Sequence, residues 1–501
     1  MIGFSPYLSI VTVSRNDNHG GELLKRMQLF IDGIFEHSTF FQLPTELIIV
    51  EWNAPDEKKK LAEELYWNKE HSYCEVRIIE VNSDIHKHYR KPDKLPLHQM
   101  IGKNVGVQRA RAPFILATNI DILFSKSLFQ YLAKRQLESD KVYRAERYDI
   151  DHRISVNMNF EEKQRYCKNN VIRKYKKEGT FSTSCATDSE LFGATEGWTH
   201  NSLGRKMVHP FTNACGDFQL MSRKKWIETK GYPEFDIYPV HMDSLLQFIC
   251  LKHGIQEEIL NVNMNIYHID HEGSWSPATE RAILHKFSEN QIPSLSNVEM
   301  YALVEYMFKH QSFSFNHNNW GLNELKLPEW VLKSGEDIFT AVPANQEQTG
   351  EGSWELACDT DKWIKRLPTL VNNMLTRSTA SFEDWVAAMH SGSGDIHSFD
   401  LEKKQIYIFG TGNCYQYYVR PVLEQFEVDI ECFIDNDQNK WGQEVDQIPI
   451  NSPDVLSHIH KEEVFILVAS SYYGMMKHQL ECMGFLEGKH FVRAWIFSSP
   501  H

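Results

Sequence analysis

The chain has no apolar run of about 18 or more residues, so nothing in it predicts a membrane-spanning helix. Its first residues, MIGFSPYLSIVTV, lack the charged start of a secretory signal and pass directly into a strand-like run. The nine cysteines include no CxxC pair, which is typical of a reducing compartment and not of a disulfide-stapled secreted domain. These absences predict a cytoplasmic protein and leave association with the inner face of a membrane open.

An excess of positive charge is also missing. The chain has 53 Lys and Arg against 67 Asp and Glu, a net charge of −14, which argues against a general nucleic-acid binder. The local exception is the stretch from Lys163 to Lys177, where seven residues are Lys or Arg. We interpret it as a solvated surface or, alternatively, as a contact for a phosphate-bearing acceptor or an anionic membrane. The oligomeric state is left open.

The length of 501 residues predicts two or three domains, and 42% apolar with 24% charged residues is typical of a folded protein. Over the first 290 or so residues, strand-like runs alternate with helical periodicity, which predicts an α/β fold with a mostly parallel sheet and helices on both faces. The predicted strands of this part are Leu8–Val13, Glu46–Val50, Val76–Val81, Pro113–Thr118 and Met264–Ile269. The predicted helices are Glu22–Phe35, Asp56–Trp67, Met100–Ala110, Lys224–Lys230 and Asp243–Lys252.

The rest of the chain divides into two further parts. Residues 291–400 have mainly helical patterns and predict a connecting region. Residues 401–501 begin a second α/β pattern, with a strand at Gln405–Phe409, a glycine turn and a helix from Cys414. This last part predicts a small Rossmann-like domain of about 100 residues.

The fourth apolar run is followed by Asn119-Ile120-Asp121. On an extended chain two side chains two positions apart point the same way, and oxygen ligands suit a hard divalent cation. Strand-end Asn and Asp also cap turns, so the tripeptide alone is a weak signal for a metal site. Its setting gives it more weight.

Four segments, in order, resemble the glycosyltransferases of family 2 and related GT-A-fold enzymes. Gly102 to Asp121 resembles the N-x-G-x-x-x-A-x-G-x-[FY]-[IL] stretch that precedes their DxD motif. The others are the opening strand and turn Ser9–Asn16, the acidic Glu51 after the second strand, and a later segment that contains Gly216–Arg223, Gly231–Phe235 and His241–Leu245. The resemblance covers residues 8 to about 275 and implies a GT-A-type nucleotide-sugar-binding domain.

The resemblance implies a role for each matching residue. Asp121 would carry the metal charge, because Asn119 replaces the first DxD carboxylate. Asp243 would be the general base, and Asp217 is the alternative. Asp217 could instead serve only as a hydrogen-bonding residue of a turn or helix cap. The implied donor-binding residues are Thr12, Ser14, Arg15, Asn16, Glu51, Lys103, Asn104 and Asn119.

His268 and His271 follow the last predicted strand of this part. Related families place a histidine there as a third metal ligand, and His271 fits this role best, with His268 as the alternate. A histidine hydrogen-bonded in the cleft wall is the other interpretation. Two histidines three apart also suit zinc, but no cysteine or further histidine completes a four-ligand set nearby, so Mn²⁺ or Mg²⁺ is preferred. In the irregular segment before Gly216, the candidates for acceptor or diphosphate contact are Trp198, His200, Arg205 and Lys206.

In the C-terminal part, Gly410 and Gly412 follow the strand as a GxG turn, which is a weak dinucleotide signal. Tyr415 stands where a third glycine would be, which argues against bound NAD. Phe433 to Asp437 resembles the FIDND segment of Rossmann-like domains appended to polysaccharide-biosynthesis enzymes, where Asp435 would meet a ribose. We favour a scaffold without ligand for this domain.

Together these residues predict an inverting, metal-dependent transferase that moves a sugar from a nucleoside-diphosphate sugar to a glycan or lipid-linked acceptor. Similar C-terminal domains are appended to polysaccharide-biosynthesis enzymes. This resemblance points to bacterial surface polysaccharide, either capsule or O-antigen. Two alternatives remain open. The chain is a bifunctional enzyme whose C-terminal domain binds NAD or a nucleotide-sugar, or it is a non-catalytic nucleotide-sugar-binding scaffold.

Overall fold

The computed structural model describes residues 4–68, 71–177, 179–182, 189–192, 199–200, 207–208, 210–271, 292–342, 355–375, 381–390, 401, 403–412, 414–470 and 473–494. The chain forms two compact units. The first comprises Met1–Leu191, Pro210–Ser296 and Met307–Trp363, and the second comprises Phe192–His209, Asn297–Tyr306 and Ile364–His501.

The first unit is built on a nine-stranded sheet of order β14-β6-β13-β4-β1-β2-β3-β16-β17. At its centre β3, β2, β1 and β4 are parallel, and β13 runs antiparallel to β4. The strands of this sheet are β1 (Leu8–Ser14), β2 (Thr45–Trp52), β3 (Cys74–Val81), β4 (Phe114–Thr118), β6 (Lys141–Arg144), β13 (Phe218–Ser222), β14 (Gln256–Ile259), β16 (Glu329–Leu332) and β17 (Thr340–Ala341).

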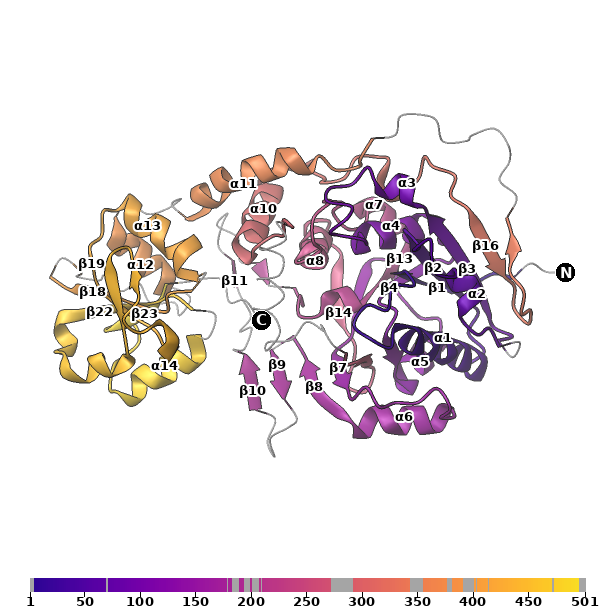
Figure 1. The fold of residues 1–501 in the computed structure, drawn as a ribbon, viewed down its shortest axis with the longest axis horizontal. Helices are drawn as coiled ribbons and strands as arrows, with labels where there is room; N and C mark the ends of the chain where they lie inside the picture. Colours follow the sequence, from indigo (N-terminus) through magenta and orange to yellow (C-terminus); the bar gives the residue numbers. More distant parts are fainter. Residues whose placement is uncertain are drawn as a thin grey trace. The chain divides into compact units, whose positions relative to one another are not determined.

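Helices cover both faces of this sheet (Figure 1). On one face lie α1 (Leu23–Phe40) and α5 (Lys126–Ala133), and α1 packs its buried side chains on β1 and β2. On the other face lie α4 (Gln99–Arg109) and α7 (Arg223–Thr229). Helix α4 crosses the strands closely because Gly102 and Gly106 face Val13 and Val11, where an added Cβ would meet those side chains at 2.5 and 2.4 Å.

A second sheet, of order β10-β9-β8-β7-β15-β5, lies in the same unit. In it β15 pairs antiparallel with β5 and parallel with β7. Its strands are β5 (Ile122–Phe124), β7 (Arg147–Ile150), β8 (Val171–Tyr175), β9 (Thr180–Ser182), β10 (Ser189–Phe192) and β15 (Ile266–Ile269). Since β5 begins directly after Asp121, this sheet starts at the candidate metal residue.

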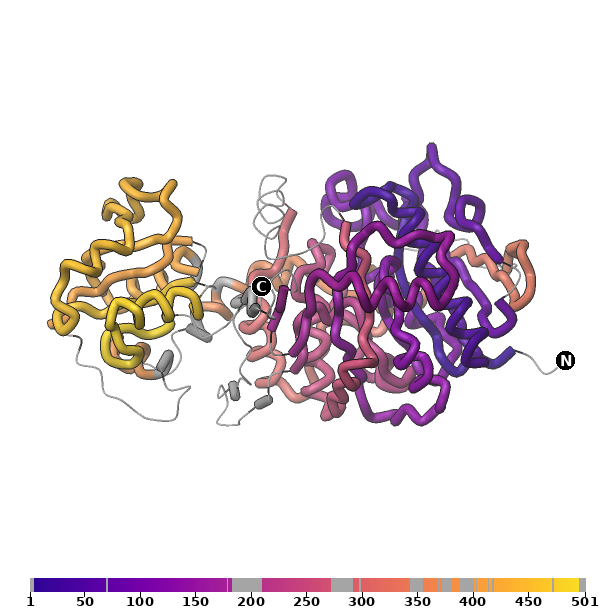
Figure 2. The backbone as a smooth tube through the Cα atoms, turned by 90° about the horizontal axis from the view of Figure 1, so that it is seen from below, coloured from indigo at the N-terminus to yellow at the C-terminus, as the bar shows by residue number. Residues whose placement is uncertain are grey.

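The structure confirms the predicted α/β class, including a largely parallel sheet with helices on both faces. It differs from the sequence prediction in three places. The predicted helix at Asp56–Trp67 shortens to α2 (Leu61–Glu64). The stretch before Asn213 contains α6 (Phe160–Asn169), which a capping box at Asn159 begins. In the region predicted as mainly helical, the hairpin β16–β17 pairs with β3, and Figures 1 and 2 show it beside the first strands of the chain.

Three of the seven basic residues between Lys163 and Lys177 pair with acidic residues of their own unit. Lys163 is buried and pairs with Glu36 at 2.8 Å. Lys177 pairs with Glu257 at 2.9 Å, and Arg173 pairs with Asp149. These pairs give the stretch a structural role. Among the described residues, no helix is long and apolar enough to cross a membrane.

The second unit contains a six-stranded sheet of order β20-β21-β19-β18-β22-β23. From β21 to β23 all neighbours are parallel, and the first strand, β18, lies between the second and a later one, so the sheet is doubly wound. Its strands are β18 (Gln405–Phe409), β19 (Ile430–Ile434), β20 (Glu444–Val445), β21 (Ile448–Asn451), β22 (Val464–Val468) and β23 (Phe491–Arg493).

Alternate residues of these strands face two separate apolar clusters, one with α12 (Phe382–His390) and α13 (Arg420–Gln425) and one with α14 (Tyr473–Cys482). Figure 1 shows this part of the chain, in orange and yellow, with its strands and helices labelled. The unit also contains the β11–β12 pair (Thr199–His200 and Met207–Val208).

Candidate active site

Most of the predicted donor, metal and base residues of the first unit gather at one edge of its sheet. The parallel strands β1, β2 and β4 end at Ser14, Trp52 and Thr118, so their carboxyl ends share that edge. Ligand sites of open α/β sheets lie at this edge. Strand β15 reaches the same place from the second sheet, where the Ile269 amide donates to the Asp121 carbonyl at 3.2 Å.

Asp121, His268 and His271 form a cluster whose ligand atoms all lie within 4.8 Å of one another. The Asp121 Oδ2 lies 3.3 Å from His271 Nε2 and 3.7 Å from His268 Nε2. Burial raises the pKa of Asp121, but His268, His271 and Arg26 outweigh it and hold that pKa well below its usual range. One ionised carboxylate with two imidazoles fits a divalent cation such as Mn²⁺.

Arg26, on α1, is a site residue that the sequence analysis missed. Its side chain is buried, and Nη1 donates to Asp121 Oδ2 at 2.8 Å. Other N–H groups of the guanidinium donate to the Gly21 carbonyl at 3.2 and 3.3 Å and to the His19 carbonyl. The apolar residues of this helix define its buried face, and the pattern predicts Arg26 to be an ordinary polar position.

Arg147 and Asp149, on β7, support His268 and were also missed. The pairing of β7 with β15 sets Asp149 opposite His268, and Asp149 Oδ1 lies 3.2 Å from His268 Nδ1. Arg147 Nη2 lies 2.9 Å from the same nitrogen, and Arg147 Nε donates to Asp149 at 2.7 Å. Metal ligation through Nε2 needs the tautomer in which Nδ1 carries the proton and donates a hydrogen bond to Asp149, and in that tautomer Nδ1 does not accept from Arg147.

Asn119 is held in a network beneath the site. Its Oδ1 accepts from Lys103 Nζ and from Gln99 Nε2, each at 2.7 Å, and its Nδ2 donates to Asp217 Oδ1 at 2.5 Å. Lys103 is fully buried, and burial lowers its pKa to about 8. Asp217 is also buried and accepts from Arg147 at 2.8 Å. Lys103 and Asp217 therefore position Asn119.

Asp243 lies at the first turn of α8 (Met242–Lys252) and, unlike Asp217, is partly exposed. Its Oδ1 accepts from the Ser244 amide at 2.9 Å, and burial raises the pKa of its carboxyl. Gly216 packs against it, because a Cβ added there would lie 2.9 Å from Asp243 Oδ2. Lys103 links Gly216 to the rest of the site by donating to the Gly216 carbonyl at 2.8 Å.

On β1 and β2, Thr12 and Glu51 are buried polar residues with unused hydrogen-bonding atoms. Among the described residues nothing pairs with Thr12 Oγ1 or Glu51 Oε2. The other carboxylate oxygen of Glu51 accepts from the Leu61 amide at 2.9 Å. Burial raises the pKa of Glu51 to about 7. Orphaned polar atoms at a strand-end edge are what a polar ligand would satisfy.

The other predicted donor residues are mostly engaged within the protein. Ser14 contacts the Met27 sulfur at 3.6 Å, Arg15 Nη1 donates to the Pro96 carbonyl at 3.3 Å, and Asn16 donates to the Lys59 carbonyl at 3.0 Å. The structure therefore places all three at the β1–α1 turn without showing a ligand contact for them.

Asn104 lies farther from the strand ends. Its Oδ1 accepts from the Tyr232 amide at 2.9 Å, and its Nδ2 donates to Glu234 at 2.8 Å. Glu234 also accepts from the Gly321 amide at 2.7 Å, and burial raises its pKa to about 7. With no exposed surface, Asn104 holds the turn after α7 in place. The side chains predicted to meet an acceptor, Trp198, His200, Arg205 and Lys206, lie outside the described part.

In the second unit, Asp435 follows β19 and is saturated by its own neighbours. Its Oδ2 accepts from the Thr411 amide and hydroxyl at 3.0 and 2.6 Å and from Lys440 Nζ at 2.7 Å. Its Oδ1 accepts from the Asp437 amide at 3.0 Å. Gly410 leaves no room for a side chain, because its φ is 104° and an added Cβ would lie 2.7 Å from the Ala469 carbonyl oxygen. At Gly412 an added Cβ would have no atom within 4 Å.

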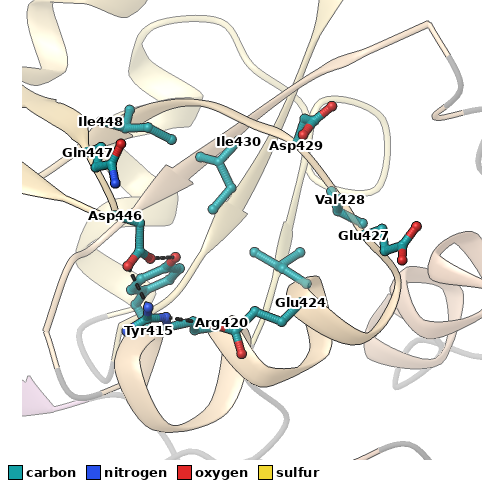
Figure 3. Close-up of a pocket in the computed structure, with 11 residues that line it drawn as sticks. Tyr415, Arg420, Glu424, Glu427, Val428, Asp429, Ile430, Asp446, Gln447 and Ile448 are labelled. Atoms are coloured by element: carbon teal, nitrogen blue, oxygen red, sulfur yellow. Dashed lines mark hydrogen bonds and ion pairs between the residues drawn. The ribbon is translucent and has the colours of Figure 1, made fainter.

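A hollow of about 540 Å³ lies in this unit, at the other end of β19 (Figure 3). It is bordered by Ile430, the first residue of β19, and by the β20–β21 hairpin. The Tyr415 hydroxyl donates to Asp446 at 2.7 Å, and Arg420 pairs with the same carboxylate at 2.7 Å. The hollow is thus separate from the glycine turn and Asp435.

Comparisons with known proteins give one family match and matches among solved structures. The family described as C2185-like, N-terminal, matches residues 402–491. Among solved structures, TarS of S. aureus (residues 1–349) is 14% identical with a TM-score of 0.30, covering 62% of this chain and 72% of that one. GalNAc-T7 with UDP, GalNAc and Mn²⁺ is 12% identical with a TM-score of 0.31, covering 60% of this chain and 48% of that one. No curated protein matches the sequence.

Proposed function

We propose that the first unit is a glycosyltransferase that moves a sugar from a nucleoside-diphosphate sugar to a hydroxyl of a glycan or lipid-linked acceptor, with inversion. The observation that carries the proposal is the meeting of Asp121, His268 and His271 at the carboxyl ends of parallel strands. Orphaned polar atoms of Thr12 and Glu51 lie on strands of the same sheet, and the carboxylate of Asp243 comes from α8.

In this mechanism Thr12 and Glu51 bind the nucleoside part of the donor. Asp121, His268 and His271 would hold Mn²⁺ or Mg²⁺, which when bound neutralises the diphosphate. Asp243 takes the proton of the acceptor hydroxyl while the hydroxyl oxygen forms a bond to the anomeric carbon. The bond from that carbon to the diphosphate oxygen breaks, and the nucleoside diphosphate leaves with the electron pair.

Asp243 is a better general base than Asp217. Both carboxylate oxygens of Asp217 are engaged, one by Asn119 and one by Arg147. Asp243 is partly exposed, and its raised pKa makes it a stronger base once ionised. The bacterial surface-polysaccharide pathway and the cytoplasmic location belong to the proposal as inferences from the sequence.

The test is a donor-hydrolysis assay with purified full-length protein, Mn²⁺ and a panel of UDP, GDP, CMP and dTDP sugars. We expect one donor to release its nucleotide, with activity lost on EDTA addition or on Asp121→Ala. Release from no donor, or release that Asp121→Ala leaves unchanged, would contradict the proposal and favour a binding scaffold.

For the second unit we propose a scaffold that binds no dinucleotide. The supporting observation is Asp435, because Thr411, Asp437 and Lys440 already donate four hydrogen bonds to its two oxygens, three of them to Oδ2 and one to Oδ1. A calorimetric titration of the full chain with NAD(H) tests this. Binding that Asp435→Asn weakens would favour the bifunctional alternative.

A further inference from the structure

The carboxylates around the candidate metal site are already balanced by guanidinium groups. Asp121 pairs with Arg26 at 2.8 Å, Asp149 with Arg147 at 2.7 Å and with Arg173 at 2.8 Å, and Asp217 with Arg147 at 2.8 Å. A divalent cation that enters this site meets no uncompensated negative charge from these residues. Its charge would have to be balanced by something else, and a diphosphate is the group that the proposed reaction brings.

Arg26 is the guanidinium that touches the same oxygen that the metal would use. Its Nη1 donates to Asp121 Oδ2, and the two candidate histidine ligands approach that oxygen at 3.3 and 3.7 Å. Because like charges repel strongly in a buried site, Arg26 and a metal ion disfavour each other at Asp121. Each therefore weakens the other's hold on the carboxylate.

Arg26 also joins this oxygen to the turn between β1 and α1. Its Nε and Nη2 groups donate to the carbonyls of His19 and Gly21, and among the described residues no partner takes the second N–H of Nη1, which is therefore available to a ligand. In this turn Asn18, Gly20, Gly21 and Glu22 all have positive φ, from 45 to 72°. For Glu22 that conformation is unfavourable without outside support. The turn continues from Ser14 and Arg15, two of the predicted donor-binding residues, so the Arg26 contacts hold Asp121 beside the segment where the donor is expected.

We propose that Arg26 is a built-in cation of this site: it neutralises Asp121 when no metal is bound and binds the donor diphosphate, so that divalent metal binds tightly only together with the diphosphate. The proposal rests on the proposed function, because it assumes a nucleoside-diphosphate donor. It adds a donor-binding residue and an order of binding, in which metal alone binds weakly. It also gives diphosphate binding a metal-independent component.

The first test measures Mn²⁺ binding without nucleotide, by the loss of the free-ion EPR signal. We expect Arg26→Ala to bind Mn²⁺ about tenfold or more tightly than the unaltered protein, because the competing charge is gone. Arg26→Lys, which keeps the charge, should bind like the unaltered protein. The matched control is Arg111→Ala, which removes a guanidinium paired with Glu46 and Glu75 near the start of β4, and it should change nothing. Mn²⁺ binding by Arg26→Ala that is unchanged or weaker would overturn the proposal.

The second test measures nucleotide binding by calorimetry in EDTA, with UDP, GDP, CDP and dTDP tried in turn. We expect the tightest of them to bind the unaltered protein without metal, and Arg26→Ala to bind it at least about tenfold more weakly. Equal binding by the two proteins, or binding that needs Mn²⁺, would overturn the proposal.

If Arg26→Ala does not fold, the unaltered protein still decides, through its Mn²⁺ affinity with and without the chosen nucleotide. A rise of about tenfold or more is expected, and an unchanged affinity would overturn the coupling. If no nucleotide binds in EDTA or in Mn²⁺, the glycosyltransferase proposal fails, whereas the Mn²⁺ test still reports whether Arg26 competes at Asp121.

Discussion

Asp121 and Asp435 stand at the same kind of place in two different sheets. Each follows an apolar strand of a parallel sheet, Asp121 three residues after β4 and Asp435 directly after β19. Their partners differ in origin. Asp121 meets Arg26 from α1 and two histidines from the end of β15, all far away in the chain. Asp435 meets Thr411, Asp437 and Lys440, most of them from its own loop.

This difference separates a candidate ligand site from a structural cap. A carboxylate whose oxygens are saturated by nearby N–H and O–H groups ties its loop together and has little left for a ligand. Asp121 instead faces imidazole nitrogens, which are metal ligands when neutral. A strand-end acid is therefore an ambiguous sign, and the residues that approach it from other elements decide its role.

The largest effect is expected from Asp121→Asn. The change removes the only carboxylate of the three-residue metal cluster, so Mn²⁺ binding in the presence of the donor nucleotide and Mn²⁺-dependent transfer should each fall by at least about 10³-fold, because bound metal contributes several kcal/mol to charge stabilisation. Calorimetry with Mn²⁺ and a transfer assay measure the two losses.

The matched variant is Asp435→Asn. It should leave Mn²⁺ binding and transfer unchanged and lower the free energy of unfolding of its unit by about 1–3 kcal/mol, as hydrogen bonds to a charged group are lost. Equal loss of transfer in the two variants would erase the distinction between the two aspartates.

A somewhat smaller effect is expected from Asp243→Asn. Without a base, transfer should fall by at least about 10²-fold, while calorimetry shows unchanged donor binding. In the unaltered protein the rate should rise with pH as Asp243 loses its proton, above the ordinary pKa of an aspartate because burial raises it. Weakened donor binding with a normal rate at saturation would instead make Asp243 a binding residue.

Much of the fold was predictable because its strands are long apolar runs that end in polar residues. The structure contains β1, β2, β3 and β4 close to the predicted bounds. The hairpin β16–β17 was not predictable, because its residues are mostly half-exposed or exposed and its strands are short. A proline suits the first turn of a helix, so Pro368 would be taken as a helix start. Helix α11 (Thr360–Leu375) in fact begins eight residues before Pro368.

Within the site, the sequence pointed to Asp121, His268 and His271, and the structure brings them together. Arg26 and Asp149 could not be predicted, because their roles depend on which strands pair and on how α1 lies over β5. Pairing of β7 with β15 aligns Asp149 with His268, although they are far apart in the chain. Periodicity reports a residue's face on its own element and says little about its partner across a sheet.

The glycines of the two units give a subtler comparison. Gly216 and Gly412 both lie in turns beside a sheet edge, but a Cβ at Gly216 would lie 2.9 Å from Asp243 Oδ2, whereas nothing lies within 4 Å of one at Gly412. Gly216→Ala should displace the Asp243 carboxylate and lower the rate about tenfold with little change in donor affinity. Gly412→Ala is the control and should leave the rate unchanged. Identical rates in both variants would show that Asp243 is not held against Gly216.

The last and smallest expectation concerns stability, through the acids Glu51 and Asp435. Burial raises the pKa of Glu51 to about 7, so between its unfolded value of 4.5 and 7 the folded chain holds a proton that the unfolded chain releases. The free energy of unfolding should therefore fall as pH rises through this window, by up to about 3 kcal/mol. Denaturant melts at pH 5 and 8 measure it, and Glu51→Gln should remove the part that Glu51 contributes, whereas Glu234, whose pKa burial also raises to about 7, keeps its own contribution.

For Asp435 the sign is opposite. Burial raises its pKa, but hydrogen bonds from Lys440 and Thr411 outweigh burial and lower it, so Asp435 stabilises its unit above the unfolded pKa of 3.8 and loses that contribution as pH falls. Stability that falls toward high pH because of Glu51 and toward low pH because of Asp435 would show that these two strand-end acids act in opposite ways. If Glu51→Gln left the pH 5 to 8 difference intact, Glu51 would already be ionised in the folded protein, and its orphaned oxygen would have to be satisfied by water.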